Sequence, residues 1–331
     1  MRLEVGHFPV RQASFGSHTR YDNGVLEIGH DALVASLRQE PRLGRVELAI
    51  THPGDSARII NYRDVLEPKV KVRGNGAAYP GVCGRPQSLV GEGRTHWLSG
   101  LAVFECVDFS GLPESDKYWP LFKQAGSYDP FVDMSGPNAV TLHASTVNVC
   151  LVMDAPRGLP PEDRNEITHT ALLRVCDYLA EATRHLEPLR IETFDMTPHP
   201  ELPGVVSIFN IASNEWFLGP RARQGTGVYG QTRLSAPWLL SPTELLDGAM
   251  TGANIWTTSY VMAANPVVLT LARQHGKTLD YLGAIVARTN WTEEGEKQMS
   301  ADRAALMAKQ LGAQGAIVTT DVRGQRFVET I

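Results

Sequence analysis

The pattern of hydrophobic and polar positions changes near residue 146. Before this point, the runs MRLEVGHFPV, GVLEIG and RVELAITH alternate in the way that half-buried strands do. Further runs rich in Val and Ile lie within 57–74 and 95–109. One short helix is expected over 31–38, and long loops rich in Gly, Pro and aromatic residues separate the strands. The pattern predicts a β-rich domain over residues 1–145.

After residue 146, continuous apolar runs alternate with helical patterns. TVNVCLVMD is typical of a buried strand, and the segment from Pro160 to Leu179 carries apolar side chains at helical spacing. The strand candidates GVVSIFNIA, YLGAIVAR and GAIVTTD are separated by the helix candidates NPVVLTLARQHGK and TEEGEKQMSADRAALMAKQLGA. This alternation predicts a mostly parallel, Rossmann-like α/β sandwich over residues 146–331. The pattern stops at what resembles the first turn of a helix, so we expect a domain that is truncated or completed by another segment.

The segment DGAMTGANIWTTSY, residues 247–260, is the strongest candidate for a functional site. It follows SPTELL, in which Ser241, Pro242 and Glu244 fit a helix capping box without any functional role. The cap does not explain Asp247 or the small residues that follow it. An Asp-Gly pair followed by small residues lets the backbone turn tightly and approach a ligand or another segment closely.

Composition and charge exclude several classes of protein. The net charge is −5, and no run of Lys and Arg is dense enough to follow a phosphate backbone, so we expect no nucleic-acid partner. No window has the ~18 apolar residues needed to cross a membrane, and the N-terminus lacks the apolar core of a signal peptide, so we expect a cytoplasmic protein. The four cysteines are scattered without C-x-x-C spacing, which argues against disulfides or a zinc knuckle. Of these, Cys83 between Gly and Pro residues is the one candidate for a reactive thiol.

Two further side chains have both a structural and a functional interpretation. His96 opens an apolar strand and is either a satisfied structural histidine or an acid–base group that faces a cleft. Asp133, two residues before Ser135 and a Gly-Pro turn, is either a backbone cap or a site residue. The histidines show no metal-binding spacing, so a metal would require a site assembled across the fold, for example by His96 and Asp133.

The chain resembles a known family through nearly its whole length. The matching runs are MRLEVGHFPVRQASFG, NGVLEIGHDAL, HPGDSARIINYRDVLEPKVKVRG, THWLSG, DMSGP, LSPTELLDGAMTGAN and NPVVLTLARQHGK. In this order they resemble the component B precursor of glycine, sarcosine and betaine reductases, and more distantly the precursor of D-proline reductase. The family pattern continues beyond residue 331 by roughly one strand–helix–strand unit.

The resemblance implies a self-processing precursor that yields α and β subunits. In the family, a cysteine at the new β N-terminus becomes a pyruvoyl group, which condenses with a substrate amine while a partner subunit, often a selenoprotein, attacks the activated carbon. That cysteine follows the Asn that corresponds to Asn254, and here the position is Ile255. Because isoleucine has no nucleophile and no leaving group, we expect no pyruvoyl group and no other organic cofactor. Thr257, Thr258 and Ser259 are the nearby hydroxyl side chains that stay open as substitutes.

The sequence therefore predicts a pyruvoyl-free subunit of an oxidoreductase complex. It would cleave a C–N or related C–heteroatom bond of a small amino-acid-like substrate, together with a component B selenoprotein-like or cysteine-containing partner in a hetero-oligomer. The candidate catalytic residues are Asp247, Asn254, His96 and Asp133, and the candidate substrate-binding residues are Tyr229, Gly248, Gly252, Thr257 and Ser259. A non-catalytic scaffold or small-molecule-binding subunit and a metal-dependent enzyme on the same fold are the two alternatives.

Overall fold

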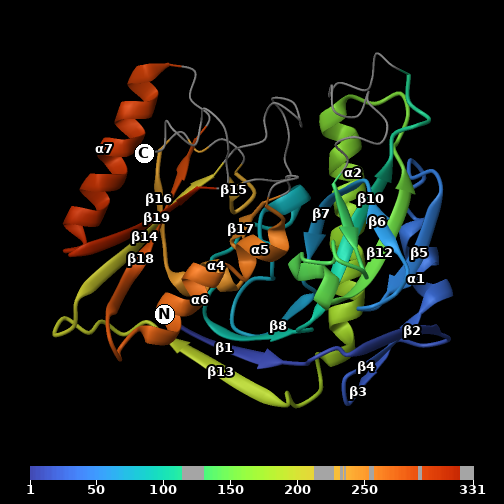
Figure 1. The fold of residues 1–331 in the computed structure, drawn as a ribbon, viewed down its shortest axis with the longest axis horizontal. Coiled ribbons are helices and arrows are strands. Elements are labelled where there is room, and N and C mark those ends of the chain that lie inside the picture. Colours follow the sequence, from blue (N-terminus) through green and yellow to red (C-terminus); the bar gives the residue numbers. More distant parts are fainter. Residues whose placement is uncertain are drawn as a thin grey trace.

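The computed structural model describes residues 1–113, 130–211, 227–231, 234, 236–252, 257–289 and 293–320 (Figure 1). Asn254 and Ile255 lie outside these ranges. The described chain is a mixed α/β protein with several mixed sheets, which confirms the predicted fold class. Three four-stranded sheets carry most of its strands.

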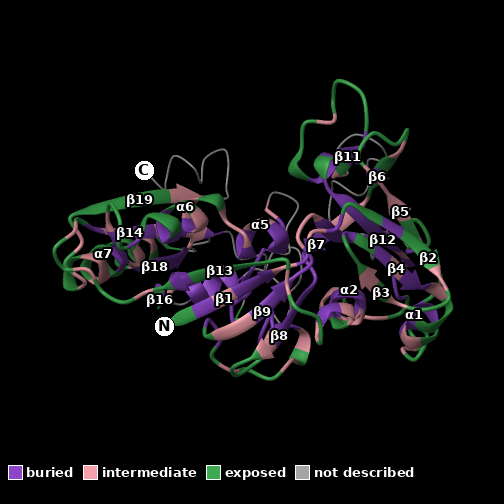
Figure 2. Ribbon diagram, turned by 90° about the horizontal axis from the view of Figure 1, so that it is seen from below, coloured by how far each residue is buried: buried purple, intermediate pink, exposed green. Residues whose placement is uncertain are grey.

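The central sheet has the strand order β13-β1-β9-β8. Strand β1 is parallel to β9, and the other two pairings are antiparallel. In Figure 2 this sheet lies between the remaining strands of the N-terminal part and the sheet of the C-terminal part. Its strands are β1 (Arg2–His7), β8 (Lys69–Arg73), β9 (Gly93–Trp97) and β13 (Arg190–Asp195).

The second sheet has the order β5-β12-β10-β7, with β10 and β12 parallel. Helix α2 packs against β10 and also contacts helix α1. The strands are β5 (Val46–Thr51), β7 (Tyr62–Leu66), β10 (Leu101–Asp108) and β12 (Val147–Asp154), and the helices are α1 (His30–Leu37) and α2 (Pro161–Ala180). Strand β12 follows the predicted boundary at residue 145 and pairs on both sides with strands that precede it. The change of sequence pattern at residue 146 thus falls inside one sheet, and the division into two domains stays a prediction.

The third sheet has the order β16-β18-β14-β19, in which β14 is parallel to both β18 and β19. Helices α6 and α7 contact β18. The elements are β14 (Gly204–Ile211), β16 (Trp238–Leu240), α6 (Pro266–Gln274), β18 (Asp280–Arg288), α7 (Glu294–Gln310) and β19 (Gly315–Thr320). Strand β16 is antiparallel to β18, so the sheet is mixed, while β14, β18 and β19 have the parallel arrangement predicted from the alternation of apolar runs and helical patterns.

Smaller elements complete the described fold. Two ribbons and a three-stranded sheet contain β2 (Gln12–Gly16), β3 (Arg20–Asp22), β4 (Val25–Gly29), β6 (Arg58–Ile60), β11 (Phe131–Asp133), β15 (Gly227–Val228) and β17 (Met250–Thr251). The short helices are η1 (Val82–Gly84), η3 (Leu142–Ser145), η4 (Glu181–Thr183), α4 (Pro242–Leu246) and α5 (Ser259–Ala263). None of the helices in the described ranges is long and apolar enough to cross a membrane.

Two large apolar cores hold these layers together. One fills the space between the second sheet and helices α1 and α2, where Leu172 is fully buried. The other joins Leu3 and Val5 of β1 to apolar residues of α4, α6 and β18. Because the central sheet contributes to the second core, its polar side chains on that side are also enclosed, and this enclosure positions the candidate site.

Replacing Leu172 by Ala should lower the free energy of unfolding by about 2–5 kcal/mol, because the fully buried side chain leaves a cavity between α2 and the second sheet. Leu306→Ala in α7 is the matched control, since that leucine is 40% exposed and its truncation should change stability by only about 0.5 kcal/mol. Urea unfolding followed by circular dichroism measures both. Equal losses would contradict the assignment of this core.

Candidate functional site

The segment that begins at Asp247 is placed by the short helix α4. Ser241 and Glu244 form the predicted capping box, in which the Glu244 carboxylate accepts the Ser241 amide at 2.6 Å. The helix ends at Asp247, and Gly248 follows with φ of +87°, a backbone conformation that favours glycine. A Cβ atom on Gly248 would lie 3.0 Å from the backbone nitrogen of Tyr79. The close approach expected from the Asp-Gly pair is therefore made to the protein's own backbone.

Asp247 is fully buried and its carboxylate accepts from three donors of the central sheet and its flanking loop. The Thr95 hydroxyl donates to Oδ1 at 2.5 Å, and the Gly91 amide donates to Oδ2 at 2.7 Å. The Lys71 ammonium forms an ion pair with the same Oδ2 and donates to the carbonyl of Glu92 at 2.9 Å. Both carboxylate oxygens accept hydrogen bonds, so Asp247 fixes the start of the segment 247–260, called the motif below, against β8 and β9.

A second buried ion pair lies beside the first. Lys69 Nζ lies 3.4 Å from Glu67 Oε2, donates to the Leu246 carbonyl at 3.2 Å, and lies 3.7 Å from the centre of the Trp97 ring. Burial lowers the pKa of Lys69 and raises the pKa of Glu67, while the attraction between them opposes both shifts. The site therefore contains two buried lysines and two buried carboxylates with balanced charge.

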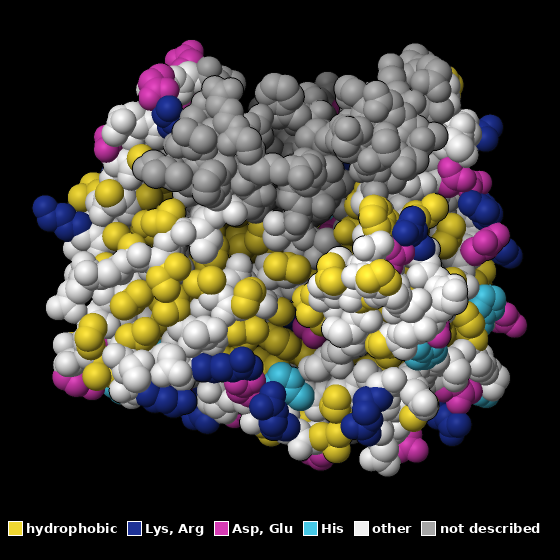
Figure 3. All heavy atoms as spheres, in the orientation of Figure 1, with side chains coloured by type: hydrophobic (Ala, Val, Ile, Leu, Met, Phe, Trp, Pro, Cys, Tyr) yellow, Lys and Arg dark blue, Asp and Glu magenta, His cyan; other side chains and the backbone are white. Residues whose placement is uncertain are grey.

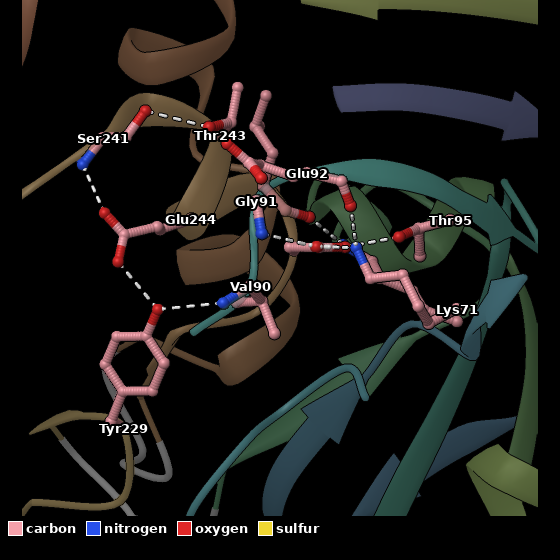
Figure 4. A network of polar contacts seen from close by, with 12 residues as sticks. Lys71, Val90, Gly91, Glu92, Thr95, Tyr229, Ser241, Thr243 and Glu244 are labelled. Carbon is pink, nitrogen blue, oxygen red and sulfur yellow. Dashed lines mark hydrogen bonds and ion pairs between the residues drawn. The ribbon is translucent and has the colours of Figure 1, made fainter. Parts of the chain in front are cut away.

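Tyr229 holds the neighbouring strand β15 to the same loop. Its hydroxyl donates to Glu244 Oε1 at 2.7 Å and accepts the Val90 amide at 3.3 Å (Figure 4). The Tyr229 side chain is almost fully buried, and burial followed by the hydrogen bond to Glu244 raises its pKa. In this structure Tyr229 is a link between α4 and the loop before β9.

The other end of the segment is anchored by a second buried cluster. Asp64 of β7 accepts the Ser259 amide on Oδ1 at 2.8 Å and the Ser259 hydroxyl on Oδ2 at 2.6 Å. His169 of α2 donates through Nδ1 to Glu105 of β10 at 2.9 Å, and its Nε2 lies 3.8 Å from Asp64 Oδ2. Gly252 closes the arrangement, because its amide donates to the Ser259 hydroxyl at 3.0 Å.

The fold raises the pKa of two members of this cluster, Asp64 and His169. Burial raises the pKa of Asp64 to about 6, against the opposing effects of His169 and Ser259. Burial alone disfavours the imidazolium of His169, but the hydrogen bond and charge of Glu105 and the charge of Asp64 raise its pKa overall. Asp64, Glu105 and His169 are all less than 3% exposed.

Two of the candidate catalytic residues lie elsewhere. His96 follows Thr95 on β9 and therefore points to the opposite face of the sheet. There its Nδ1 donates to the Thr183 carbonyl at 2.9 Å and its ring packs on Phe8, while burial lowers its pKa. This geometry is that of a satisfied structural histidine, the first of the two interpretations.

Asp133 lies on the separate ribbon formed by β6 and β11. Its carboxylate accepts from Arg58 at 2.6 and 3.0 Å, so it is paired with a guanidinium and does not cap the backbone of the Gly-Pro turn. Asp133 makes its ion pair with Arg58 and contacts neither His96 nor Asp247. Among the described residues, no group of three or more His, Cys, Asp and Glu side chains is arranged to hold a metal ion. Cys83 is half-buried, and burial raises the pKa of its thiol, which disfavours the reactive thiolate.

The structure brings Asp247, Tyr229, Gly248, Gly252 and Ser259 to one region, with Thr257 at its edge, whereas Asn254 lies outside the described residues. The sequence patterns did not indicate the buried charged side chains that hold these residues in place, which are Asp64, Glu67, Lys69, Lys71, Glu105 and His169. A signal was present for His169, which shares a helical stripe with Leu172 and Cys176. Glu105 likewise interrupts the apolar run LAVFECV.

Fold and site together define a mixed α/β protein whose central motif is fixed at both ends by buried carboxylates. A family model described as glycine/sarcosine/betaine reductase component B subunits matches residues 1–331. The chain belongs to this family. No solved structure matches it.

Curated relatives agree with this assignment. The chain is 30% identical over 345 residues to the glycine reductase complex component B subunits alpha and beta of Acetoanaerobium sticklandii, covering 100% of this chain and 75% of the relative. It is 31% identical to the betaine reductase complex component B subunit alpha of Peptoclostridium acidaminophilum, covering 98% and 73%. The sarcosine reductase complex component B subunit alpha of the same organism is 29% identical, with 98% and 74% covered.

Breaking the ion pair of Lys71 and Asp247 should be strongly destabilising. Either Lys71→Met or Asp247→Asn alone leaves a buried charge without its partner and should lower the free energy of unfolding by about 3–5 kcal/mol. The double variant should lose clearly less than the sum of the two. Denaturant unfolding of the four proteins gives the coupling energy. The control is Arg58→Met with Asp133→Asn, in which the Arg58 side chain is 55% exposed, and this pair should show weaker coupling. Additive losses at Lys71 and Asp247 would contradict their pairing.

The buried cluster around Asp64 should make stability depend on pH. Both Asp64 and His169 have pKa values raised by the fold, so their protonation stabilises the folded state at low pH. This contribution of Asp64 is complete below its unfolded pKa and is lost as pH rises through about 6, and that of His169 is lost at higher pH. The free energy of unfolding should thus fall by about 1–3 kcal/mol between pH 5 and pH 8. In the Asp64→Asn variant, the free energy of unfolding should fall by less over the same range. Parallel curves for the two proteins would rule out this titration.

Proposed function

We propose that this chain is a pyruvoyl-free subunit of a complex of the glycine, sarcosine and betaine reductase type. It would act on a C–N or related C–heteroatom bond of a small amino-acid-like substrate. The observation that carries the proposal is the combination of a family motif held at both ends by buried anchors with an isoleucine at position 255. The isoleucine side chain offers no atom for self-cleavage, so no step is assigned to a pyruvoyl group.

In the proposed reaction, the electron pair comes from a partner protein. A thiolate or selenolate of that partner attacks the substrate carbon, and the amine leaves with the electrons of the broken bond and takes up a proton. Asp247 and Tyr229 act by position: their polar atoms are already bonded within the protein, so they fix the backbone from Gly248 to Gly252. This backbone is the element proposed to line the substrate site.

A cavity of about 630 Å³ beside the central sheet supports a small polar substrate. It borders the start of this backbone through Lys69 and Lys71, which bind Leu246 and Asp247. Residues of β8 line one side of it, and the opposite side carries Arg85, Asp177, Glu181 and Arg184. Its volume lies in the range of ligand sites, and its lining bears charges of both signs, which form the ion pairs Arg85–Asp177 and Arg184–Glu181.

Exposed apolar side chains support a protein partner. Trp238 and Leu239 on β16 are 38% and 44% exposed, and this strand is an end of the described four-stranded sheet. Figure 3 shows hydrophobic side chains gathered on the left of the view, on the side of the molecule that contains the third sheet. Because successive residues of a strand point to opposite faces, these two side chains leave apolar surface on both sides of an edge strand, and exposed apolar surface of this kind is typical of an interaction site.

A non-catalytic scaffold is the second candidate function. It is favoured by the Asp247 carboxylate and the Ser259 hydroxyl, which are both engaged by protein groups and not presented to a ligand. In that case, the chain would position the partner subunit without contributing to bond cleavage.

Intact mass spectrometry and partner binding test the proposal. The purified chain should have the uncut mass of 36.3 kDa and should not react with hydroxylamine or other carbonyl reagents. A component B precursor with cysteine at the corresponding position is the positive control. The chain should co-purify with the cysteine- or selenocysteine-containing protein encoded beside it, and the complex should release an amine from a small amino-acid-like substrate.

The outcomes separate the alternatives. Two polypeptides or a carbonyl-reactive terminus would contradict the pyruvoyl-free assignment. A stable complex without amine release from any candidate substrate would favour the scaffold. Trp238→Ser should weaken partner binding by about tenfold if β16 forms the interface, because truncation of a central aromatic side chain commonly removes 1–2 kcal/mol.

A further inference from the structure

The backbone at Gly252 lies directly against the backbone at residues 257–259, and we call this contact the neck. The Gly252 amide donates to the Ser259 hydroxyl, and a Cβ atom on Gly252 would lie 2.3 Å from the carbonyl oxygen of Thr257. There is no room for a side chain at this position, so two parts of the backbone are packed directly against each other. The neck is therefore a closed structure made by Gly252 at one side and 257–259 at the other.

The buried carboxylate of Asp64 connects this neck to strand β7. Asp64 accepts both the amide and the hydroxyl of Ser259, and the hydroxyl in turn accepts the Gly252 amide. The two ends of the neck are thus connected to β7 through one side chain. Asp64 itself is fully buried and also accepts the amide of Val65 at 2.8 Å.

One imidazolium, that of His169, offsets part of the negative charge of Asp64 and Glu105. Glu105 and His169 face it from β10 and α2, and Arg63 is the other charged side chain that acts on His169. The charge of Asp64 also acts on the hydroxyls of Tyr62 and Tyr79 and on the thiol of Cys176, and burial raises the pKa of all three groups, so they stay protonated at neutral pH. Two carboxylates and one imidazolium therefore share this enclosed space, and loss of the imidazolium proton leaves two buried carboxylates facing each other.

We propose that Glu105, His169 and Asp64 form a proton-dependent clamp that closes the neck between Gly252 and Ser259. Asp64 accepts from Ser259, and imidazolium His169, which is oriented by Glu105, offsets negative charge in the cluster. As pH rises and His169 loses its proton, the clamp loosens, and the backbone around Gly252 and Ser259 opens. The three side chains are positioning residues, and the clamp operates whether the subunit is catalytic or a scaffold.

Amide hydrogen exchange of the full-length chain reads the clamp directly, independently of any enzymatic activity. Protection factors, corrected for the intrinsic pH dependence of exchange, are measured for the Gly252 and Ser259 amides between pH 6 and pH 9. In the natural chain, protection should fall by about tenfold across this range as His169 loses its proton. Asp64→Asn should lower protection by about tenfold at pH 6 already and should flatten the pH profile.

Substitutions at Ser259 separate the two halves of the clamp. Ser259→Ala removes the acceptor of the Gly252 amide but keeps the amide of residue 259 bonded to Asp64, so only Gly252 should lose protection. Ser259→Thr keeps a hydroxyl and should restore protection at Gly252. A purely apolar contact at the neck would give no such difference between the two amides.

Asp280→Asn is the matched control, because Asp280 is a buried carboxylate 3.3 Å from His275 in the C-terminal sheet and does not touch the neck. It should change the overall stability without a selective effect on Gly252 and Ser259, relative to amides of α2. The proposal is overturned if Asp64→Asn leaves both protection factors unchanged, if Asp280→Asn lowers them equally, or if the natural chain shows no pH dependence.

Discussion

The ion pair between Asp247 and Lys71 is the interaction on which the arrangement of the site depends. It joins the end of α4 to the central sheet in an enclosed region, where an unpartnered charge would be strongly unfavourable. The Thr95 hydroxyl and the Gly91 amide supply the remaining donors, so the carboxylate has one orientation in which all its bonds are made. That orientation determines where Gly248 turns and how closely it approaches Tyr79. The second apolar core, which joins β1 to α4, α6 and β18, then packs over the ion pair and keeps water from it.

The two buried clusters are alike in one respect and different in another. At Asp247, the ammonium groups of two lysine side chains neutralise the carboxylates in two neighbouring ion pairs. At Asp64, the neutralising group is an imidazole, whose charge changes near neutral pH. The start of the motif is therefore fixed, whereas its end at Ser259 is attached through a group that can change its charge. The segment is therefore attached rigidly at Asp247 and in a pH-dependent way at Ser259.

The periodic patterns of the sequence correctly predicted most helices and strands, because each reports one local property, the spacing of apolar side chains. They also predicted the capping box at Ser241, since its partners are three residues apart. They failed for Glu67, Lys69 and Lys71, which alternate with valines in EPKVKV and resemble the solvated face of a strand. That face is buried because residues more than 170 positions away pack over it, and no local pattern contains this information.

The same limitation applies to His96, for which the sequence left a structural and a functional interpretation open. A histidine at the start of an apolar strand has two faces available to it, and only the register of the sheet decides which one it takes. Thr95 occupies the face toward Asp247, so His96 must take the other, where Thr183 and Phe8 surround it. Within the described residues, the polar atoms closest to the motif are consequently committed to holding the backbone in place. A chain that uses its charged side chains in this way presents a shaped surface more than a reactive group, and this favours chemistry in which the attacking atom comes from a second protein.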